Sequence, residues 1–245
     1  KLIGIKTLEI LKILEKRKMK VSLTIKPSFD GIGEQHDEIR GVKGNFQTLL
    51  TTLEELKKIQ KDYPNLHIGV GTVISRFNFK DINKISEYGI KLDVDTYISE
   101  IAERRSELLN TESDITPNSK DYEEAIKHFS NKIRLNITKK RGLDKITQAF
   151  RLVYYQIALR TVKEKRQIIP CYAGWTNAHL TPDGIVWPCC IRGYNSVMGD
   201  LRKTDYNFRR VWQSKKAKDI RTSIKHKECY CPLANQAFSN ILLNP

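Results

Sequence analysis

Residues 171–190 read CYAGWTNAHLTPDGIVWPCC, and residues 227–236 read KECYCPLANQ. All five cysteines of the 245-residue chain lie in these two stretches. Pro182-Asp183-Gly184 is typical of a turn between two short strands, which predicts a hairpin that brings Cys171 and Cys189 towards a common end. The late Cys-x-Cys pair could then complete four thiolates, the number that an iron–sulfur cluster or a structural zinc ion requires.

This clustering decides how the sulfurs are interpreted. An isolated buried cysteine usually packs as a small apolar residue. Five cysteines gathered beside Gly and Pro turns indicate metal or cluster ligation instead. Zinc favours Cys-x2-Cys pairs and clusters accept more varied spacing, so the spacing alone leaves both metals open.

Composition excludes several classes of protein. Hydrophobic residues make up 40% of the chain, so a folded globular protein is expected. No apolar run approaches the roughly 20 residues of a membrane span, and no export signal is visible. The cysteines then indicate a reducing compartment, which predicts a cytoplasmic protein.

The net charge of +15 raises nucleic acid, anionic lipid or acidic substrates as partners. The basic residues are spread over every segment, without a compact basic stripe interleaved with aromatic residues. Nucleic acid is therefore not the expected partner.

The first part of the chain alternates helices and strands. Apolar spacing predicts a helix over 5–17, a buried strand from Val21, a glycine-containing loop after it, and a helix over 46–61 capped by Asn45. LHIGVGTVIS at 66–75 predicts a second strand, residues 81–89 a short helix ending at Gly89, and residues 90–98 a third strand. This order predicts parallel pairing in an α/β fold.

From Ser99 the apolar period becomes helical. We expect a helix to Asn110, a second from Asp121 to about Lys140 and a third from Leu143 to about Arg166. Composition changes near Gln167 to turns, aromatics and cysteines. The predicted domains are therefore residues 1–98, 99–166 and 167–245.

Two motifs resemble one known family. SFDGIGEQHDEIRGVKGNF at 28–46 is similar to the fourth-strand region of radical SAM enzymes. The tail resembles the SPASM or twitch extension of the same superfamily, through Cys-x12-Gly-x4-Cys, MGDLRK, RRVWQSKKAKDIR and the terminal cysteines. Residues 5–95 and 168–240 carry the resemblance, and 99–165 match no motif.

The resemblance implies the fold: the later half of a partial TIM-like (β/α)6 barrel, a helical segment, and a small cysteine-rich α+β twitch/SPASM domain. Radical SAM barrels carry Cys-x3-Cys-x2-Cys after their first strand, where a 4Fe-4S cluster cleaves S-adenosylmethionine. This sequence lacks that motif and begins with Lys1. We therefore expect an upstream part with S-adenosylmethionine and the second cluster, without which the chain is inactive, or else a non-catalytic relative.

Site residues follow from the same resemblance. Ser28 would lie near the ribose or carboxylate of S-adenosylmethionine, and Asn78 lies at the ligand face of the sheet. Arg40 could clamp a carboxylate, or it could pair with Glu34 or Asp37. His36 is expected to fix its loop. One auxiliary 4Fe-4S cluster would be held by Cys171, Cys189, Cys229 and Cys231, with Cys190 able to replace one of the pair.

The implied activity is radical modification of a peptide or protein through hydrogen abstraction by the 5′-deoxyadenosyl radical, with an electron donor such as flavodoxin or ferredoxin. One alternative is dehydrogenation of a sugar, cyclitol or other small molecule. The other is a non-catalytic cluster- or zinc-bearing module that binds nucleic acid or a protein partner.

Overall fold

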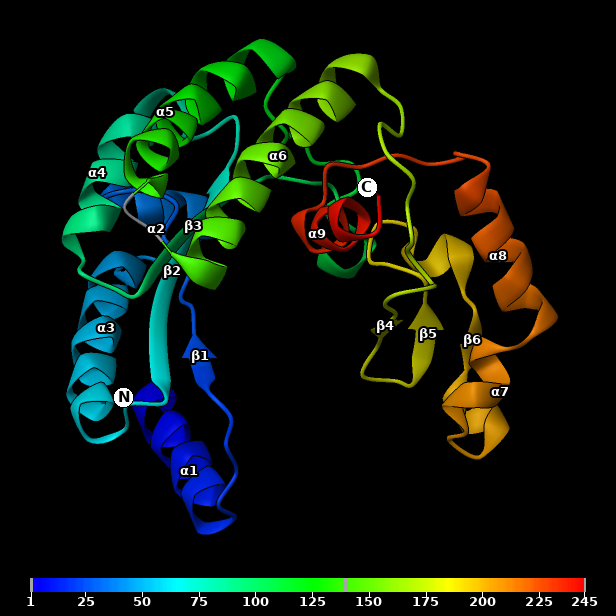
Figure 1. The fold of residues 1–245 in the computed structure, drawn as a ribbon, viewed down its shortest axis with the longest axis horizontal. Coiled ribbons are helices and arrows are strands. Elements are labelled where there is room, and N and C mark those ends of the chain that lie inside the picture. Colours follow the sequence, from blue (N-terminus) through cyan, green and yellow to red (C-terminus); the bar gives the residue numbers. More distant parts are fainter. Residues whose placement is uncertain (1, 139–140, 245) are drawn as a thin grey trace. The chain divides into compact units, whose positions relative to one another are not determined.

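The structure is a computed structural model that describes residues 2–138 and 141–244. The chain forms two compact units, residues 1–100 and residues 101–245 (Figure 1). Residues 101–166, which were expected to be separate from the cysteine-bearing tail, lie in the same compact unit as that tail. The three functional domains assigned from the sequence stay a prediction.

The first unit alternates helices with three strands, which form a sheet in the order β1-β2-β3. β1 pairs with β2 in parallel, with Leu23 opposite Leu66 and Ile25 opposite Ile68. The predicted α/β class with a parallel sheet is thereby confirmed. The elements are α1 (Leu2–Lys16), β1 (Leu23–Ile25), α2 (Glu34–Arg40), α3 (Asn45–Asp62), β2 (Leu66–Ile74), η1 (Phe79–Asp81), α4 (Ile82–Lys91) and β3 (Thr96–Ile101).

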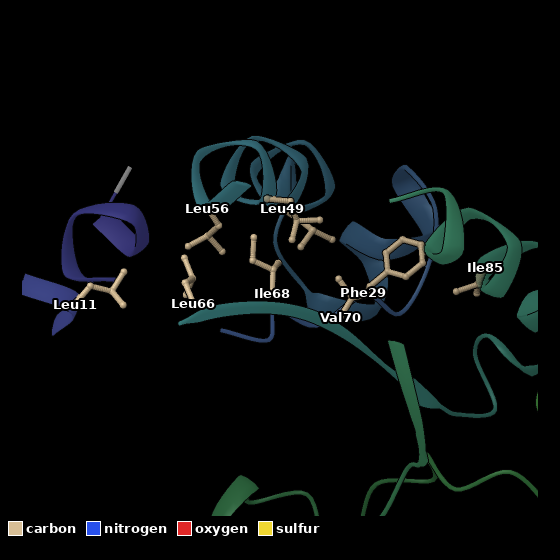
Figure 2. Packing of buried hydrophobic residues seen from close by; sticks show 9 residues of the cluster. Leu11, Phe29, Leu49, Leu56, Leu66, Ile68, Val70 and Ile85 are labelled. Atoms are coloured by element: carbon tan, nitrogen blue, oxygen red, sulfur yellow. The ribbon is translucent and has the colours of Figure 1, made fainter. Parts of the chain in front are cut away.

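The core of this unit lies between β2 and the helices beside it. Figure 2 shows Leu49 and Leu56 of α3 pointing toward Leu66, Ile68 and Val70 of β2. Each of these five side chains is at most 6% exposed. Full burial of such a side chain contributes about 1.5–3 kcal/mol, so this contact fixes how α3 covers the sheet. Leu11 from α1 and Ile85 from α4 belong to the same cluster.

The expected boundaries around β3 were wrong. Gly89 does not end the helix, because α4 continues to Lys91. A side chain at Gly89 would approach the rings of Tyr97 and Phe29 to 3.1 and 3.2 Å, so the glycine provides close packing instead of a cap. The strand begins at Thr96, and Asp95 accepts a 2.7 Å hydrogen bond from Ile68 N.

The helix expected over 99–110 is not formed. Residues 99–101 continue β3, and a short 3-10 turn, η2 (Ser106–Leu108), follows. Asn110 Oδ1 accepts a 2.6 Å hydrogen bond from Arg105 N and stabilises this irregular segment. The loop expected after β1 also contains the helix α2, and Gly44, not Asn45, is the N-cap of α3.

The second unit combines helices with a small antiparallel sheet. α5 (Ser119–Ile137) and α6 (Gly142–Glu164) pack together, and α6 also contacts α9 (Ala234–Leu242). The predicted end of the first of these helices near Lys140 lies outside the described residues. The remaining elements are β4 (His179–Leu180), β5 (Ile185–Trp187), η3 (Gly193–Ser196), β6 (Gly199–Asp200), η4 (Leu201–Thr204), α7 (Phe208–Trp212) and α8 (Lys215–Lys225).

The predicted hairpin is confirmed. β4 pairs with β5 in antiparallel fashion, with His179 opposite Trp187. Gly184 turns the chain with φ of 81°, a conformation that favours glycine, and its N–H donates to Thr181 O at 3.0 Å. β5 ends at Trp187, and only Pro188 separates it from the adjacent Cys189 and Cys190.

No helix in the described ranges has the length and apolar character needed to cross a bilayer.

Candidate metal centre

Four of the five cysteines line one pocket of the second unit. They are Cys171, Cys189, Cys229 and Cys231, and they surround a cavity of about 40 Å³. α6 closes it with Tyr154, Ile157 and Ala158, and α9 with Gln236, Ala237 and Asn240. The hairpin therefore brings Cys171 and Cys189 together as the sequence predicts, and the late Cys-x-Cys pair lies beside them.

Each sulfur is positioned by a nearby element. Cys189 follows β5 and packs with Ala173 and Ile224 of α8 in a small apolar cluster that Cys171 and Cys229 also contact. Cys229 and Cys231 lie in the chain segment that connects α8 to α9. Arg221 of α8 donates a 2.5 Å hydrogen bond to Gly174 O, which holds the loop after Cys171 against α8.

Main-chain N–H groups point at the sulfurs. Cys189 accepts hydrogen bonds from the N–H groups of Ile191 and Arg192. Cys171 accepts from Ala173 N and from the side chain of Asn240, and Cys231 accepts from Leu233 N. Such donors stabilise a thiolate, the form in which cysteine binds metals.

The pocket nevertheless keeps the thiols of Cys171, Cys189 and Cys231 protonated when no metal is bound. Burial raises the pKa of Cys189 to about 11, and the neighbouring Cys171 and Cys229 add to the rise. Burial also raises the pKa of Cys171 and, by more, that of Cys231. Metal loading must therefore expel protons, and its affinity falls as the pH is lowered.

Cys190 lies outside the lining of this pocket and interacts with a different group of residues. Burial raises its pKa to about 12, and the charge of Glu107 raises it further. Arg105, which lies 3.7 Å from Glu107 Oε1, opposes the rise. Cys189 thus faces the pocket, and Cys190, the next residue, faces η2.

The donor set suits an iron–sulfur cluster or a zinc ion, because four thiols gather in one buried pocket lined with N–H donors. Within residues 2–138 and 141–244, no three His, Cys, Asp or Glu side chains already stand at metal-binding geometry. Ligation would therefore require the four sulfurs to move together around the metal.

The candidate S-adenosylmethionine contacts lie in the first unit. Asp30 is 2% exposed, and its Oδ2 accepts from Arg40 Nη1 at 3.1 Å while its Oδ1 accepts from Val73 N at 2.7 Å. Burial raises the pKa of Asp30, and the hydrogen bond from Val73 and the charge of Arg40 oppose the rise. Arg40 thus pairs with Asp30 and not with Glu34 or Asp37, the two partners considered from the sequence.

Asn78 joins the same network. Its Nδ2 donates to Asp30 O at 2.8 Å and to Val73 O at 2.9 Å, and its Oδ1 accepts from Ser75 N at 2.8 Å. Ser28 lies two residues before Asp30 and bridges to Gly71 of β2. The structure therefore brings Arg40 and Asn78 to Asp30 at the ends of β1 and β2, and their proposed contacts with S-adenosylmethionine stay a prediction.

His36 is fully buried and fixes its loop, as the sequence interpretation expected. Asp30 N donates to His36 Nδ1 at 3.2 Å, so the proton lies on Nε2, which donates to Asn45 Oδ1 at 2.8 Å. Asn45 therefore contributes a side-chain contact to α2 instead of the expected cap.

Sequence reasoning missed four residues around the sulfurs. They are Glu103, Tyr154, Arg221 and Asn240, which come from separate segments of the second unit. The buried amide residues at 236 and 240, spaced by one helical turn, were the only pattern that could have indicated an inward-facing polar pair on α9. No pattern in the sequence indicates that Glu103, Tyr154 or Arg221 lies near the sulfurs.

Comparison with known proteins identifies the tail. Residues 171–232 match the SPASM family, described as an iron-sulfur cluster-binding domain. The match includes all five cysteines and ends one residue after Cys231. A search of curated proteins finds no match.

Solved structures share the fold. "Native anSMEcpe with bound AdoMet" matches with a TM-score of 0.53 at 15% identity, over 86% of this chain and 54% of that chain. A histidine-tagged form of anSMEcpe, also with bound AdoMet, matches with 0.54 at 15% identity, over 86% and 52%. "Native anSMEcpe with bound AdoMet and Cp18Cys peptide" matches with 0.50 at 15% identity, over 86% and 55%.

The chain thus spans about half the length of the structures it matches. The resemblance read from the sequence is confirmed by the domain match and by the shared fold. The chain carries a SPASM iron–sulfur cluster-binding domain at residues 171–232, and it shares the fold of anSMEcpe.

Proposed function

We propose that this chain is part of a radical SAM enzyme and holds one auxiliary 4Fe-4S cluster on Cys171, Cys189, Cys229 and Cys231. The observation that carries the proposal is the pocket that these four thiols line, from which Cys190 is turned away. Four thiols are the full ligand set of a 4Fe-4S cluster, so Cys190 is not needed.

The residues around the pocket have defined tasks in this proposal. When bound, an iron–sulfur cluster supplies one-electron chemistry or an anchoring site. The N–H groups of Ala173, Ile191 and Leu233 stabilise the thiolates, and α6 and α9 exclude water. α8 keeps the Cys171 loop in place through Arg221.

Cleavage of S-adenosylmethionine belongs in this proposal to the whole enzyme. The sequence contains no Cys-x3-Cys-x2-Cys, so the 245-residue chain by itself is inactive. Ser28, Arg40 and Asn78 contribute to the S-adenosylmethionine site once the remaining barrel is supplied. An electron donor such as flavodoxin or ferredoxin completes the system.

The proposed substrate is a peptide or protein. One matched structure holds a peptide together with AdoMet, and this favours a peptide over a sugar or cyclitol. Incubation of the complete enzyme with a peptide and, separately, with small alcohols distinguishes the two, because S-adenosylmethionine is consumed in a substrate-dependent way only with the correct class.

Metal analysis tests the site itself. After anaerobic preparation we expect about four irons and four sulfides per chain. Cys189→Ser should lose the cluster, while the matched control Cys190→Ser, one residue along the chain, should keep it. One zinc ion without sulfide would overturn the cluster assignment, and equal loss in both variants would overturn the ligand set.

A further inference from the structure

α9 presents two amide side chains to the thiol pocket. Gln236 is 2% exposed and Asn240 is 7% exposed, and both line the pocket. They are four residues apart on the helix and therefore lie on the same face. Polar side chains buried to this extent are normally fixed by hydrogen bonds.

The amide of Asn240 has one orientation. Its Oδ1 accepts hydrogen bonds from Tyr172 N at 2.9 Å and from Gln236 Nε2 at 2.9 Å. A carbonyl oxygen has two lone pairs, so both acceptor positions are used. If the oxygen and nitrogen of the Asn240 amide exchanged places, Nδ2 would face two other hydrogen-bond donors, Tyr172 N and Gln236 Nε2. Nδ2 is therefore the atom through which Asn240 can donate to the sulfur of Cys171, which lines the same pocket, and hydrogen bonding from this side chain lowers the pKa of Cys171.

Gln236 maintains this orientation. Its Nε2 donates to Asn240, and its own Oε1 has no hydrogen-bond partner within the described residues. Rotation of the Gln236 amide by 180° would place its oxygen against Asn240 Oδ1, and two acceptors would then face each other. Gln236 Nε2 therefore stays directed at Asn240 Oδ1. Gln236 is thus a positioning residue that acts through Asn240.

We propose that Asn240, held by Gln236, donates a hydrogen bond to the Cys171 thiolate of the bound cluster and raises its reduction potential. This inference rests on the proposed cluster. Reduction adds a negative charge to the cluster and its ligands, so a donor to a ligand sulfur stabilises the reduced state more than the oxidised state. Cys189 and Cys231 accept main-chain hydrogen bonds, which substitution does not remove.

The donor comes from outside the matched domain. The SPASM match ends at residue 232, and α9 begins at Ala234. The cysteine-bearing segment therefore supplies the ligands, and the helix that follows it adjusts the potential of the cluster.

Substitution on α9 tests the inference in the whole chain, reconstituted anaerobically with iron and sulfide. Asn240→Leu should lower the midpoint potential, and the reduced-to-oxidised ratio at fixed potential should fall by up to about tenfold, or ~59 mV for one electron. Asn235→Leu, on the exposed side of the same helix, is the matched control and should leave the potential unchanged. Gln236→Met should give a smaller shift in the same direction.

Each result has a consequence. Absence of iron and sulfide from the wild-type chain would overturn the proposed function and this inference together. A loaded Asn240→Leu with the wild-type potential would overturn the inference alone. If Asn240→Leu does not load, Gln236→Met decides: a lowered potential supports the inference, and an unchanged potential overturns it.

Discussion

Tyr154 Oη on α6 donates a 3.2 Å hydrogen bond to the carbonyl oxygen of Pro232, the residue after Cys231. Tyr154 is 1% exposed, and its Oη also accepts a hydrogen bond from Ile101 N at 3.4 Å. A helix that ends before the first cysteine thereby holds the last one in place. The SPASM match, which begins at residue 171, does not include this contact.

Tyr154→Phe should therefore destabilise the second unit. The change leaves two buried main-chain groups without their partner, at a cost of about 1–3 kcal/mol. Urea unfolding of the metal-free chain, followed by circular dichroism, measures the loss. Tyr206→Phe is the matched control, since Tyr206 is 73% exposed. Equal stability of the two variants would contradict the assigned role.

Arg221→Lys should weaken the loop that carries Cys171. The guanidinium lies 4.3 Å from the Trp212 ring and 5.1 Å from the Trp175 ring, and Nε donates to Gly174 O. Lysine keeps the charge but loses the planar group that stacks on both indoles. We expect a loss of roughly 1.5–3 kcal/mol in unfolding free energy, the range for a hydrogen bond from a charged group.

Arg209→Lys is the control for that substitution, because Arg209 is exposed on α7. Tryptophan fluorescence during urea unfolding reports on both indoles directly. If Arg221→Lys unfolds at the same urea concentration as Arg209→Lys, the stacked arginine does not hold the loop.

Glu103→Gln should change how stability depends on pH. Burial raises the pKa of Glu103 from 4.5 to about 7, against the opposing charges of Arg105 and Arg104. Between these values the folded chain holds a proton that the unfolded chain releases. The contribution of Glu103 to the free energy of unfolding is therefore complete below pH 4.5 and is lost as the pH rises through this window to 7. The loss is about 1.4 kcal/mol for each unit by which the pKa is raised.

The variant lacks this ionisation, so the stability difference between Glu103→Gln and wild type should grow from pH 4.5 to 7. Thermal unfolding of the metal-free proteins at a series of pH values measures it. Glu112→Gln, at an exposed position, should show no such trend. A difference that is constant with pH would rule out a raised pKa at Glu103.

Gly31→Ala should destabilise the first unit. A side chain at Gly31 would lie 2.7 Å from His36 N and 3.0 Å from the carbonyl carbon of Gln35, both main-chain atoms that cannot turn aside. Forced displacement of this kind costs about 1–3 kcal/mol. At Gly71 the nearest atom would be Ile98 Cγ1 at 3.6 Å, an ordinary contact, so Gly71→Ala should be tolerated. Denaturant midpoints of the two variants make the comparison, and equal midpoints would contradict it.

The limits of sequence reasoning are clear around β3. The short segment ISEI at 98–101 fits a helix or a strand equally well, since so few residues do not distinguish the two periods. Asp95 fixed the outcome by accepting a hydrogen bond from Ile68 N, a residue 27 positions earlier. Gly89 likewise suggested a helix end, but its packing against Tyr97 and Phe29 accounts for it. Both errors came from contacts between segments that no local pattern contains.

By itself the sequence determined the α/β order of the first unit, the hairpin turn at Gly184 and the gathering of every cysteine in one segment, because each depends on local spacing and turn chemistry. Only the tertiary structure decided which cysteines share a pocket. Cys189 and Cys190 are adjacent, yet one faces α6 and α9 while the other faces Glu107. That choice, like the orientation of Asn240, depends on side chains that meet only when distant segments pack together, so it is a property of the fold and not of any stretch of the sequence.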